Sequence, residues 1–202
     1  GVDSSSDDSS IDSDDEMEVD PNTGLGLGKE NCVGGEMIMM IHQKSIVKVE
    51  VTSKTYNHKQ PWSSPIIDGG SGSGFVIRFG NKLCIATNAH VVSGAVEVSV
   101  RQAFGKKNYQ TRIISVGHQC DCALVELPEA LWDKVTPVDM TSGWLNVGER
   151  VYVLGFPQLG EEICITDGVV ARREVDEYSH SGWDGLQYGG SAAINPGNSG
   201  GA

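Results

Sequence analysis

Short apolar runs separated by turn residues fill the chain from residue 45 onward. In the first run Val47, Val49 and Val51 alternate with polar residues, which is the period of a strand with one buried face. Helical periodicity is not evident, apart from one short turn of helix expected at Pro128–Lys134. Many short strands with turn signals between them favour a β-sandwich or a β-barrel. The clearest predicted strands are Ser45–Thr52, Gly74–Phe79, Leu83–Thr87, Val96–Val100, Thr111–Val116, Cys122–Leu127, Arg150–Leu154, Ile163–Ile165 and Val169–Ala171.

The beginning of the chain has a different composition from the rest. Residues 1–20 hold nine acidic side chains and no basic one, and a glycine-rich stretch follows them. Such a segment buries too little apolar surface to offset the entropy lost on ordering. We therefore predict an acidic disordered tail and glycine-rich linker over 1–36, and one folded domain over 37–202.

The net charge of the whole chain is −12, from 27 acidic and 15 basic residues. This balance argues against nucleic-acid binding, which requires a basic surface. No apolar run approaches the length of about 18 residues that a membrane-spanning helix needs, so we expect no transmembrane segment.

Five cysteines stand at irregular spacings and form no C-x-x-C motif. The odd number argues against a disulfide framework, and the spacing argues against a zinc site. We therefore expect an intracellular, reducing setting with no metal and no cofactor, whether nucleus, cytoplasm, plastid or mitochondrion. Cys120 and Cys122 could form a redox pair or bind a metal, but the favoured interpretation is that both are buried small hydrophobic residues.

Three residues that can carry hydrolytic chemistry occur in the order His, Asp, Ser. His90 follows one apolar strand, Asp121 begins another, and Ser199 lies in the glycine-rich run Asn195–Gly201. A serine hydroxyl needs a base to become a nucleophile, and that base needs a carboxylate to orient it. Each residue alone has an ordinary structural explanation, but the combination predicts a catalytic triad.

The run around Ser199 also fits a second requirement of acyl transfer. Glycines permit positive φ, so successive backbone N–H groups can point into one concavity. Donors placed in this way stabilise the oxyanion of a tetrahedral intermediate. We expect the amides of Gly197 and Ser199 to form this oxyanion hole, and a plain glycine-rich turn is the structural alternative.

The segments T-N-A-H-V-V, C-D-C-A-L and N-P-G-N-S-G-G, which hold the three residues, resemble the HtrA/Deg family of trypsin-like serine proteases. The likeness continues through Gly72–Ile77, Gly155–Pro157 and Thr166–Val170. Together with Pro61-Trp62, these segments are most similar to the eukaryotic, plant-type Deg branch. The resemblance covers about residues 45–202.

The resemblance implies an all-β, trypsin-like fold of two six-stranded antiparallel β-barrels, with the active site in the cleft between them. It implies an ATP-independent serine endopeptidase that cleaves unfolded or damaged proteins and assembles into trimer-based homo-oligomers. A non-catalytic, chaperone-like binding module on the same fold is the alternative. Family members have further strands of the second barrel after the nucleophile, so a chain ending at Ala202 is expected to be a piece of a longer protein with an incomplete second barrel.

The resemblance also implies that Ala193, Ile194 and Asn198 contribute to substrate binding. Ala193 lies six residues before the nucleophile, at the base of the primary specificity pocket, so small to medium apolar side chains are expected there rather than Lys or Arg. Asn198 replaces the aspartate of digestive relatives. Because its side chain is neutral, it cannot form an ion pair with a newly cut N-terminus, and activation by cleavage is not expected.

Overall fold

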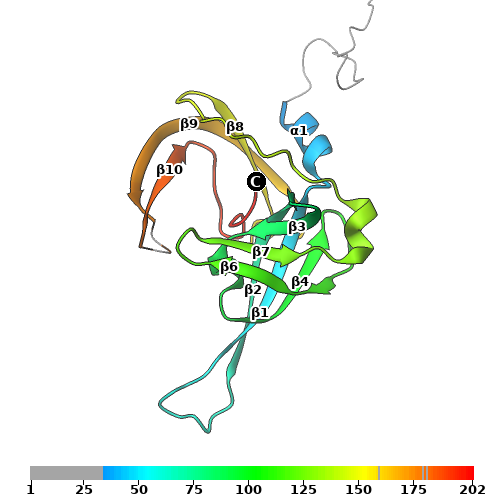
Figure 1. Cartoon of the computed structure of the whole chain (residues 1–202), viewed down its shortest axis with the longest axis vertical. Coiled ribbons are helices and arrows are strands. Elements are labelled where there is room, and N and C mark those ends of the chain that lie inside the picture. The colour runs from blue at the N-terminus through cyan, green and yellow to red at the C-terminus, as the bar shows by residue number, and fades with distance from the viewer. Residues whose placement is uncertain (1–33, 159, 179, 181) are drawn as a thin grey trace, which may run out of the picture. The chain divides into compact units, whose positions relative to one another are not determined.

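The computed structural model describes residues 34–158, 160–178, 180 and 182–202, so the predicted acidic tail lies almost entirely outside the described residues. The described part is built mainly of strands, as predicted (Figure 1). Its elements are α1 (Gly34–His42), β1 (Ile46–Thr55), β2 (Ile66–Phe79), β3 (Lys82–Thr87), α2 (Ala89–Val92), β4 (Ala95–Gln102), β5 (Tyr109–Thr111), β6 (Ile113–Gly117), β7 (Cys122–Glu126), the 3-10 helix η1 (Glu129–Lys134), β8 (Arg150–Gly155), β9 (Cys164–Glu177) and β10 (Asp184–Gly190). None of the described helices is long and apolar enough to cross a membrane.

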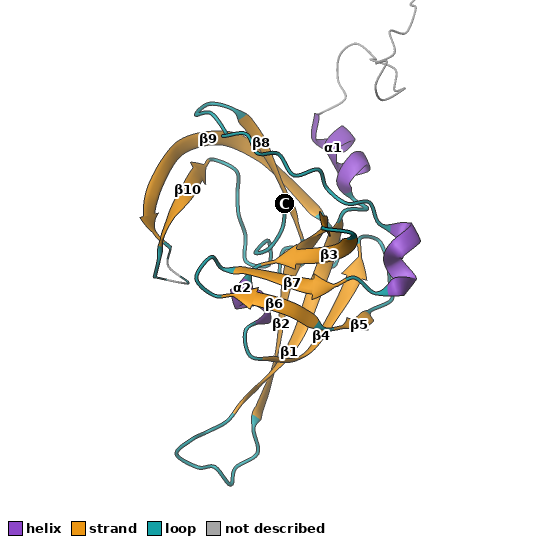
Figure 2. Ribbon diagram, viewed as in Figure 1, coloured by secondary structure: helices purple, strands orange, loops and turns teal. Residues whose placement is uncertain are grey.

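Seven strands form one antiparallel sheet in the order β5-β4-β1-β2-β3-β7-β6 (Figure 2). Its two outer strands are consecutive in the chain and are separated only by Arg112. The sheet closes through this break, because Glu126 of β7 donates its amide hydrogen to the Arg112 carbonyl (2.9 Å) and the Thr111 hydroxyl donates to the Glu126 carbonyl (2.6 Å). β5 and β6 thus act as one bent strand, the predicted Thr111–Val116, and the ring is a six-stranded barrel.

The barrel interior is filled by the apolar members of the alternating strands. Val47, Val49, Val76, Ile85 and Val125 are all fully buried in one core cluster. The polar positions between them face the outside of the barrel, as their period of two requires. The alternation in the sequence therefore predicted the inner face of β1 correctly. The outer face is buried as well at the start of the strand, because Ile46 packs in a second core cluster and Lys48 pairs with Glu161.

A second, three-stranded sheet has the order β10-β9-β8. The predicted strands Ile163–Ile165 and Val169–Ala171 are parts of the single strand β9, because Asp167-Gly168 does not form a turn. At Gly168 a side chain would collide with the backbone of Ala192, so the glycine serves a close approach of two chain segments. β10 was not predicted, since its glycines and polar residues give no apolar alternation.

A smaller core cluster joins the first barrel to the second sheet. It is formed by Ile46, Leu154, Phe156 and Ile163, with Ile38 and Met39 of α1 packed against it. Helix α1 was not predicted, and only one side of it contacts the core, since Met40 is 72% exposed. The short helix expected at Pro128–Lys134 is η1.

Candidate active site

His90 lies in α2, the single helical turn that follows β3. Ala89 and Val92 of this turn are buried, which anchors it in the barrel and leaves His90 half-buried at the surface. The amide of Ala89 donates to the carbonyl of Asp121 (3.1 Å), and the Asn88 side chain donates to the same carbonyl (2.9 Å). The backbone around His90 is therefore joined directly to the segment that carries the aspartate.

Asp121 directly precedes β7 and is only 2% exposed. Its φ of +48° lies in the left-handed region, which non-glycine residues adopt infrequently. One carboxylate oxygen, Oδ2, lies 2.7 Å from Nδ1 of His90, and Oδ1 accepts a hydrogen bond of 2.8 Å from the His90 amide. The carboxylate therefore contacts both the ring and the backbone of the histidine, which fixes the orientation of the ring.

A third donor to this carboxylate comes from the second sheet. The hydroxyl of Tyr178 donates to Oδ2 of Asp121 over 2.8 Å. Burial by itself would raise the pKa of Asp121, but the hydrogen bonds from the His90 backbone, the His90 ring and Tyr178 outweigh it and hold this pKa below its usual value. Asp121 is therefore ionised at neutral pH.

The Ser199 loop is a series of tight backbone turns. Gly197 and Gly200 have φ of +97° and +82°, and side chains at either position would collide with neighbouring segments. The backbone amide of Asn198 donates to the backbone carbonyl of Asn195 (3.0 Å), and the amide of Gly201 donates to the backbone carbonyl of Asn198 (2.9 Å). The loop is thus held by its own backbone hydrogen bonds on both sides of the serine.

The loop packs against the segment that leads to His90. Gly200 lies against the Thr87 hydroxyl and the Asn88 amide, and the Ser199 carbonyl accepts a hydrogen bond from the amide of Ser73 (2.8 Å). Ser199 itself is half-buried. Its hydroxyl forms no hydrogen bond with the His90 ring in the described part of the chain, and such contacts often tighten only when substrate is bound.

The two expected oxyanion-hole donors are the backbone amides of Gly197 and Ser199. Among the described residues, neither the Gly197 amide nor the Ser199 amide donates a hydrogen bond to the protein. By contrast, the intervening Asn198 amide is engaged with Asn195. Two amides on alternate residues of one loop are thus left available to an external acceptor.

The residues expected to bind substrate lie in different environments. Ala193 and Ile194 are exposed, and the Ala193 carbonyl accepts a hydrogen bond from the Thr166 hydroxyl (2.8 Å). Asn198 is only 5% exposed, and its Oδ1 has no hydrogen-bond partner within the described residues. The side chain of Asn198 faces Gly155, inside the protein.

The expectation that Cys120 and Cys122 are buried hydrophobic residues is wrong, because both are exposed. Cys120 lies in the turn before β7 and Cys122 begins β7 at an exposed position, while the buried positions of this segment belong to Asp121 and Ala123. The Cys122 thiol is nevertheless partly desolvated, and this and the neighbouring Cys120 thiol raise its pKa.

Sequence reasoning missed two residues that contact the candidate site. Tyr178 donates to Asp121, and the ring of His180 is stacked on that of His90, with 4.0 Å between centroids and 10° between planes. Both lie between β9 and β10, and no motif marks them. Their role depends on a β9–β10 hairpin, which the local sequence pattern does not predict.

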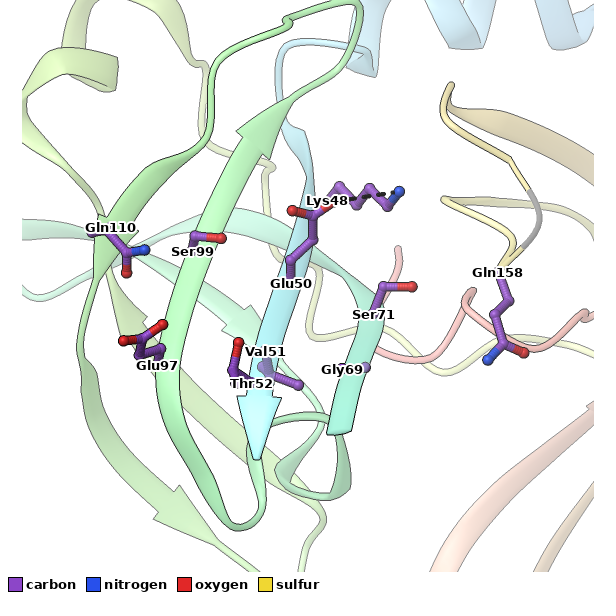
Figure 3. Close-up of a pocket in the computed structure, with 11 residues that line it drawn as sticks. Lys48, Glu50, Val51, Thr52, Gly69, Ser71, Glu97, Ser99, Gln110 and Gln158 are labelled. Atoms are coloured by element: carbon purple, nitrogen blue, oxygen red, sulfur yellow. Dashed lines mark ion pairs between the residues drawn. The ribbon is translucent and has the colours of Figure 1, made fainter. Parts of the chain in front are cut away.

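A separate cavity of about 470 Å³ lies over β4, β1 and β2 (Figure 3). Its lining is mainly polar and includes Lys48, whose ammonium lies 3.5 Å from Glu50 and 3.2 Å from Glu161. His90, Asp121 and Ser199 do not line it. This cavity is therefore distinct from the candidate active site.

The fold and the site agree with comparisons to known proteins. Residues 72–202 match the family model of the trypsin-like peptidase domain. The chain is 38% identical over 159 residues to the mitochondrial protease Do-like 4 of Arabidopsis thaliana, and 36% identical over 159 residues to the chloroplastic protease Do-like 2 of the same plant. A solved HtrA-type protease, AlgW with a decapeptide, has the same fold, with a TM-score of 0.60 at 20% identity over 81% of this chain and 53% of that one.

The chain belongs to the trypsin-like peptidase domain family. Within it, the chain belongs to the HtrA/Deg group of serine proteases, as the resemblance of its motifs predicted: it is 32% identical over 151 residues to the putative chloroplastic protease Do-like 6 of Arabidopsis thaliana and covers 67% of that protein. The matches to Do-like 4 and Do-like 2 cover 78% of this chain, but only 30% of the former and 25% of the latter. The chain thus spans less than a third of the length of either of these two relatives.

Proposed function

We propose that this chain is the protease domain of an ATP-independent serine endopeptidase that cleaves unfolded or damaged proteins. The observation that carries the proposal is the hydrogen-bonded pair of His90 and the buried Asp121, next to a glycine-rich loop that presents Ser199. In this proposal His90 is the general base, Asp121 orients it and Ser199 is the nucleophile.

The geometry of the site supports these roles. Because the ionised Asp121 engages Nδ1 of His90, the opposite ring nitrogen is the one free to take the proton of the Ser199 hydroxyl. Ser199 then attacks the scissile carbonyl, and the protonated His90 gives its proton to the leaving amine. A water molecule, activated by the same histidine, hydrolyses the acyl-enzyme.

The oxyanion of each tetrahedral intermediate would be bound by the amides of Gly197 and Ser199. Both amides are without a partner among the described residues, so they need not break a protein hydrogen bond to bind it. Removing one such donor typically costs about two to three powers of ten in rate. No metal or cofactor enters this mechanism.

Substrate selection is proposed to occur beside Ala193 and Ile194, which are exposed. Because Ala193 supplies no carboxylate, peptides with Val, Ala or Leu before the scissile bond should be cleaved faster than those with Lys or Arg. We further propose trimer-based homo-oligomers and an intracellular compartment, which the mitochondrial and chloroplastic names of the relatives support.

A non-catalytic, chaperone-like binding module is the second candidate. The observation that favours it is the absence of a hydrogen bond between the Ser199 hydroxyl and the His90 ring among the described residues. The two candidates differ in whether the bound protein is cut, so one experiment separates them.

The test compares the full-length protein with its Ser199→Ala variant on unfolded casein. A protease predicts fragments with the wild type and a loss of rate on the order of 10⁶ in the variant. Binding of casein by both proteins without fragments would support the chaperone-like module and overturn the protease.

A further inference from the structure

Tyr178 is the first residue after β9, and its backbone closes the turn to β10. Its amide donates to the carbonyl of Trp183 (2.9 Å), and its carbonyl accepts from the amide of Gly182 (2.7 Å). Because the amide and the carbonyl of Tyr178 both form hydrogen bonds within the turn, the backbone at Tyr178 is held in one position. The side chain is half-buried and lines a cavity of about 650 Å³ together with Asn88 and Asp121.

The hydroxyl of Tyr178 donates to a carboxylate oxygen that also contacts the His90 ring. Oδ2 of Asp121 lies 2.8 Å from this hydroxyl and 2.7 Å from Nδ1 of His90. One donor belongs to the β9–β10 hairpin and the other to α2 of the barrel. Together with the bond from the His90 amide to Oδ1, the carboxylate is held by three donors and cannot rotate without losing at least one.

The hydroxyl of Tyr178 stays protonated, and therefore remains a donor, at pH values near neutrality. Burial, and next the Asp121 carboxylate, raise the pKa of Tyr178 to about 12. A phenol that stays protonated can only donate to the ionised carboxylate, so the direction of this hydrogen bond does not change with pH near neutrality. Hydrogen bonds to charged groups are also the stronger ones.

The same turn contacts the histidine as well as the aspartate. The His180 ring is stacked on His90 at 4.0 Å, and it lies 5.5 Å from the Tyr178 ring at an angle of 53°. In Figure 1 the end of β9 and the start of β10 lie beside the barrel, near the turn between β6 and β7. One short segment of the second sheet therefore contacts both members of the His90–Asp121 pair.

We propose that Tyr178 is a positioning residue, which acts on catalysis through Asp121. Its hydroxyl holds the carboxylate in the orientation that faces Nδ1 of His90. It thereby links the β9–β10 hairpin to the orientation of the His90 ring. This inference rests on the proposed function, because the position of His90 affects rate only if His90 is the catalytic base.

Tyr178→Phe removes the hydroxyl and keeps the ring. Tyr188→Phe is the matched control, since Tyr188 lies on β10, lines the same cavity and donates no hydrogen bond from its hydroxyl within the described residues. We expect Tyr178→Phe to lower kcat about tenfold with KM unchanged, the size expected for a lost hydrogen bond to a charged group. The control should leave both constants at the wild-type value.

A second readout follows the hydrogen bond itself and needs no turnover. In histidine-labelled full-length protein, the Nδ1 proton of His90 gives a low-field NMR signal whose position reports the bond to Asp121. Without the Tyr178 hydroxyl the carboxylate is held less firmly against Nδ1, so Tyr178→Phe should weaken this bond and move the signal upfield. Incorporation of 3-fluorotyrosine at position 178 keeps the hydroxyl as a donor, so the signal should stay close to its wild-type position.

The two readouts separate failure of the inference from failure of the proposed function. If the wild type does not turn over, the protease proposal fails, and the His90 signal alone decides whether Tyr178 positions Asp121. The inference is overturned if Tyr178→Phe matches Tyr188→Phe in the position of that signal, or if kcat is the same in both variants of an active protein.

Discussion

The hydroxyl of Ser73 and the carbonyl of Gly197 are joined by a buried hydrogen bond of 2.8 Å, although the two residues lie in different parts of the chain. The same hydroxyl accepts a hydrogen bond of 2.7 Å from the amide of Phe156. Ser73 belongs to β2 of the barrel, and Phe156 follows β8 of the second sheet. A single fully buried side chain therefore joins the Ser199 loop to both sheets.

Ser73→Ala should weaken the site from a distance. It leaves the Gly197 carbonyl and the Phe156 amide without their partner, at about 1–3 kcal/mol for each buried group left unpaired. We expect a lower free energy of unfolding and a lower kcat, measured by urea denaturation and peptide cleavage. Ser71→Ala is the control, because Ser71 lies on the same strand and its hydroxyl forms no hydrogen bond within the described residues. Equal effects of the two substitutions would contradict the role given to Ser73.

Gly200→Ala should abolish activity. A Cβ at this position would collide with the Ser73 carbonyl and the Thr87 hydroxyl, on a backbone with φ of +82°. Gly94→Ala is a matched control, since its φ is +67° but nothing lies within 4 Å of the added carbon. The control should cost only about 1 kcal/mol of backbone strain and retain cleavage. An active Gly200→Ala protein would show that the loop does not need its close packing.

Asp121 should contribute stability that depends on pH in a defined direction. Its pKa is lower in the folded protein than its ordinary value, so folding favours the ionised form. The contribution is fully present above the unfolded pKa of about 3.9 and is lost as the pH falls through the lower folded value. The stability difference between wild type and Asp121→Asn, measured by urea denaturation, should therefore be largest at neutral pH and shrink below about pH 4. A difference that grows on acidification would contradict this sign.

Local sequence predicted those parts of the fold in which each strand has its own apolar pattern. The alternation in Ser45–Thr52 predicted β1 and the face that it turns to the barrel interior. The order of the motifs along the chain predicted that His90 and Asp121 belong to one catalytic triad. The structure then joins this pair by a hydrogen bond of 2.7 Å. For this pair, the prediction from the local motifs agrees with the contact between the two segments in the structure.

The features that sequence reasoning missed depend on contacts between distant segments. Asp167-Gly168 has the composition of a turn, yet it continues β9 because the backbone of Ala192 comes close to Gly168. Tyr178 reaches Asp121 only because β10 returns beside β9. Cys120 and Cys122 are exposed because Asp121 and Ala123 are the residues of this segment that the barrel buries. The periodicity of apolar residues along a chain contains no information on contacts between distant segments.

The proposed mechanism requires Ser199 to be a nucleophile activated by His90. The most direct measurement is the covalent labelling of the full-length protein by a fluorophosphonate, with the modified residue identified by mass spectrometry. We expect one phosphonylated residue, Ser199, with labelling lost in Ser199→Ala and strongly slowed in His90→Ala. Failure of the folded wild type to label, or a label that persists unchanged in Ser199→Ala, would contradict the account.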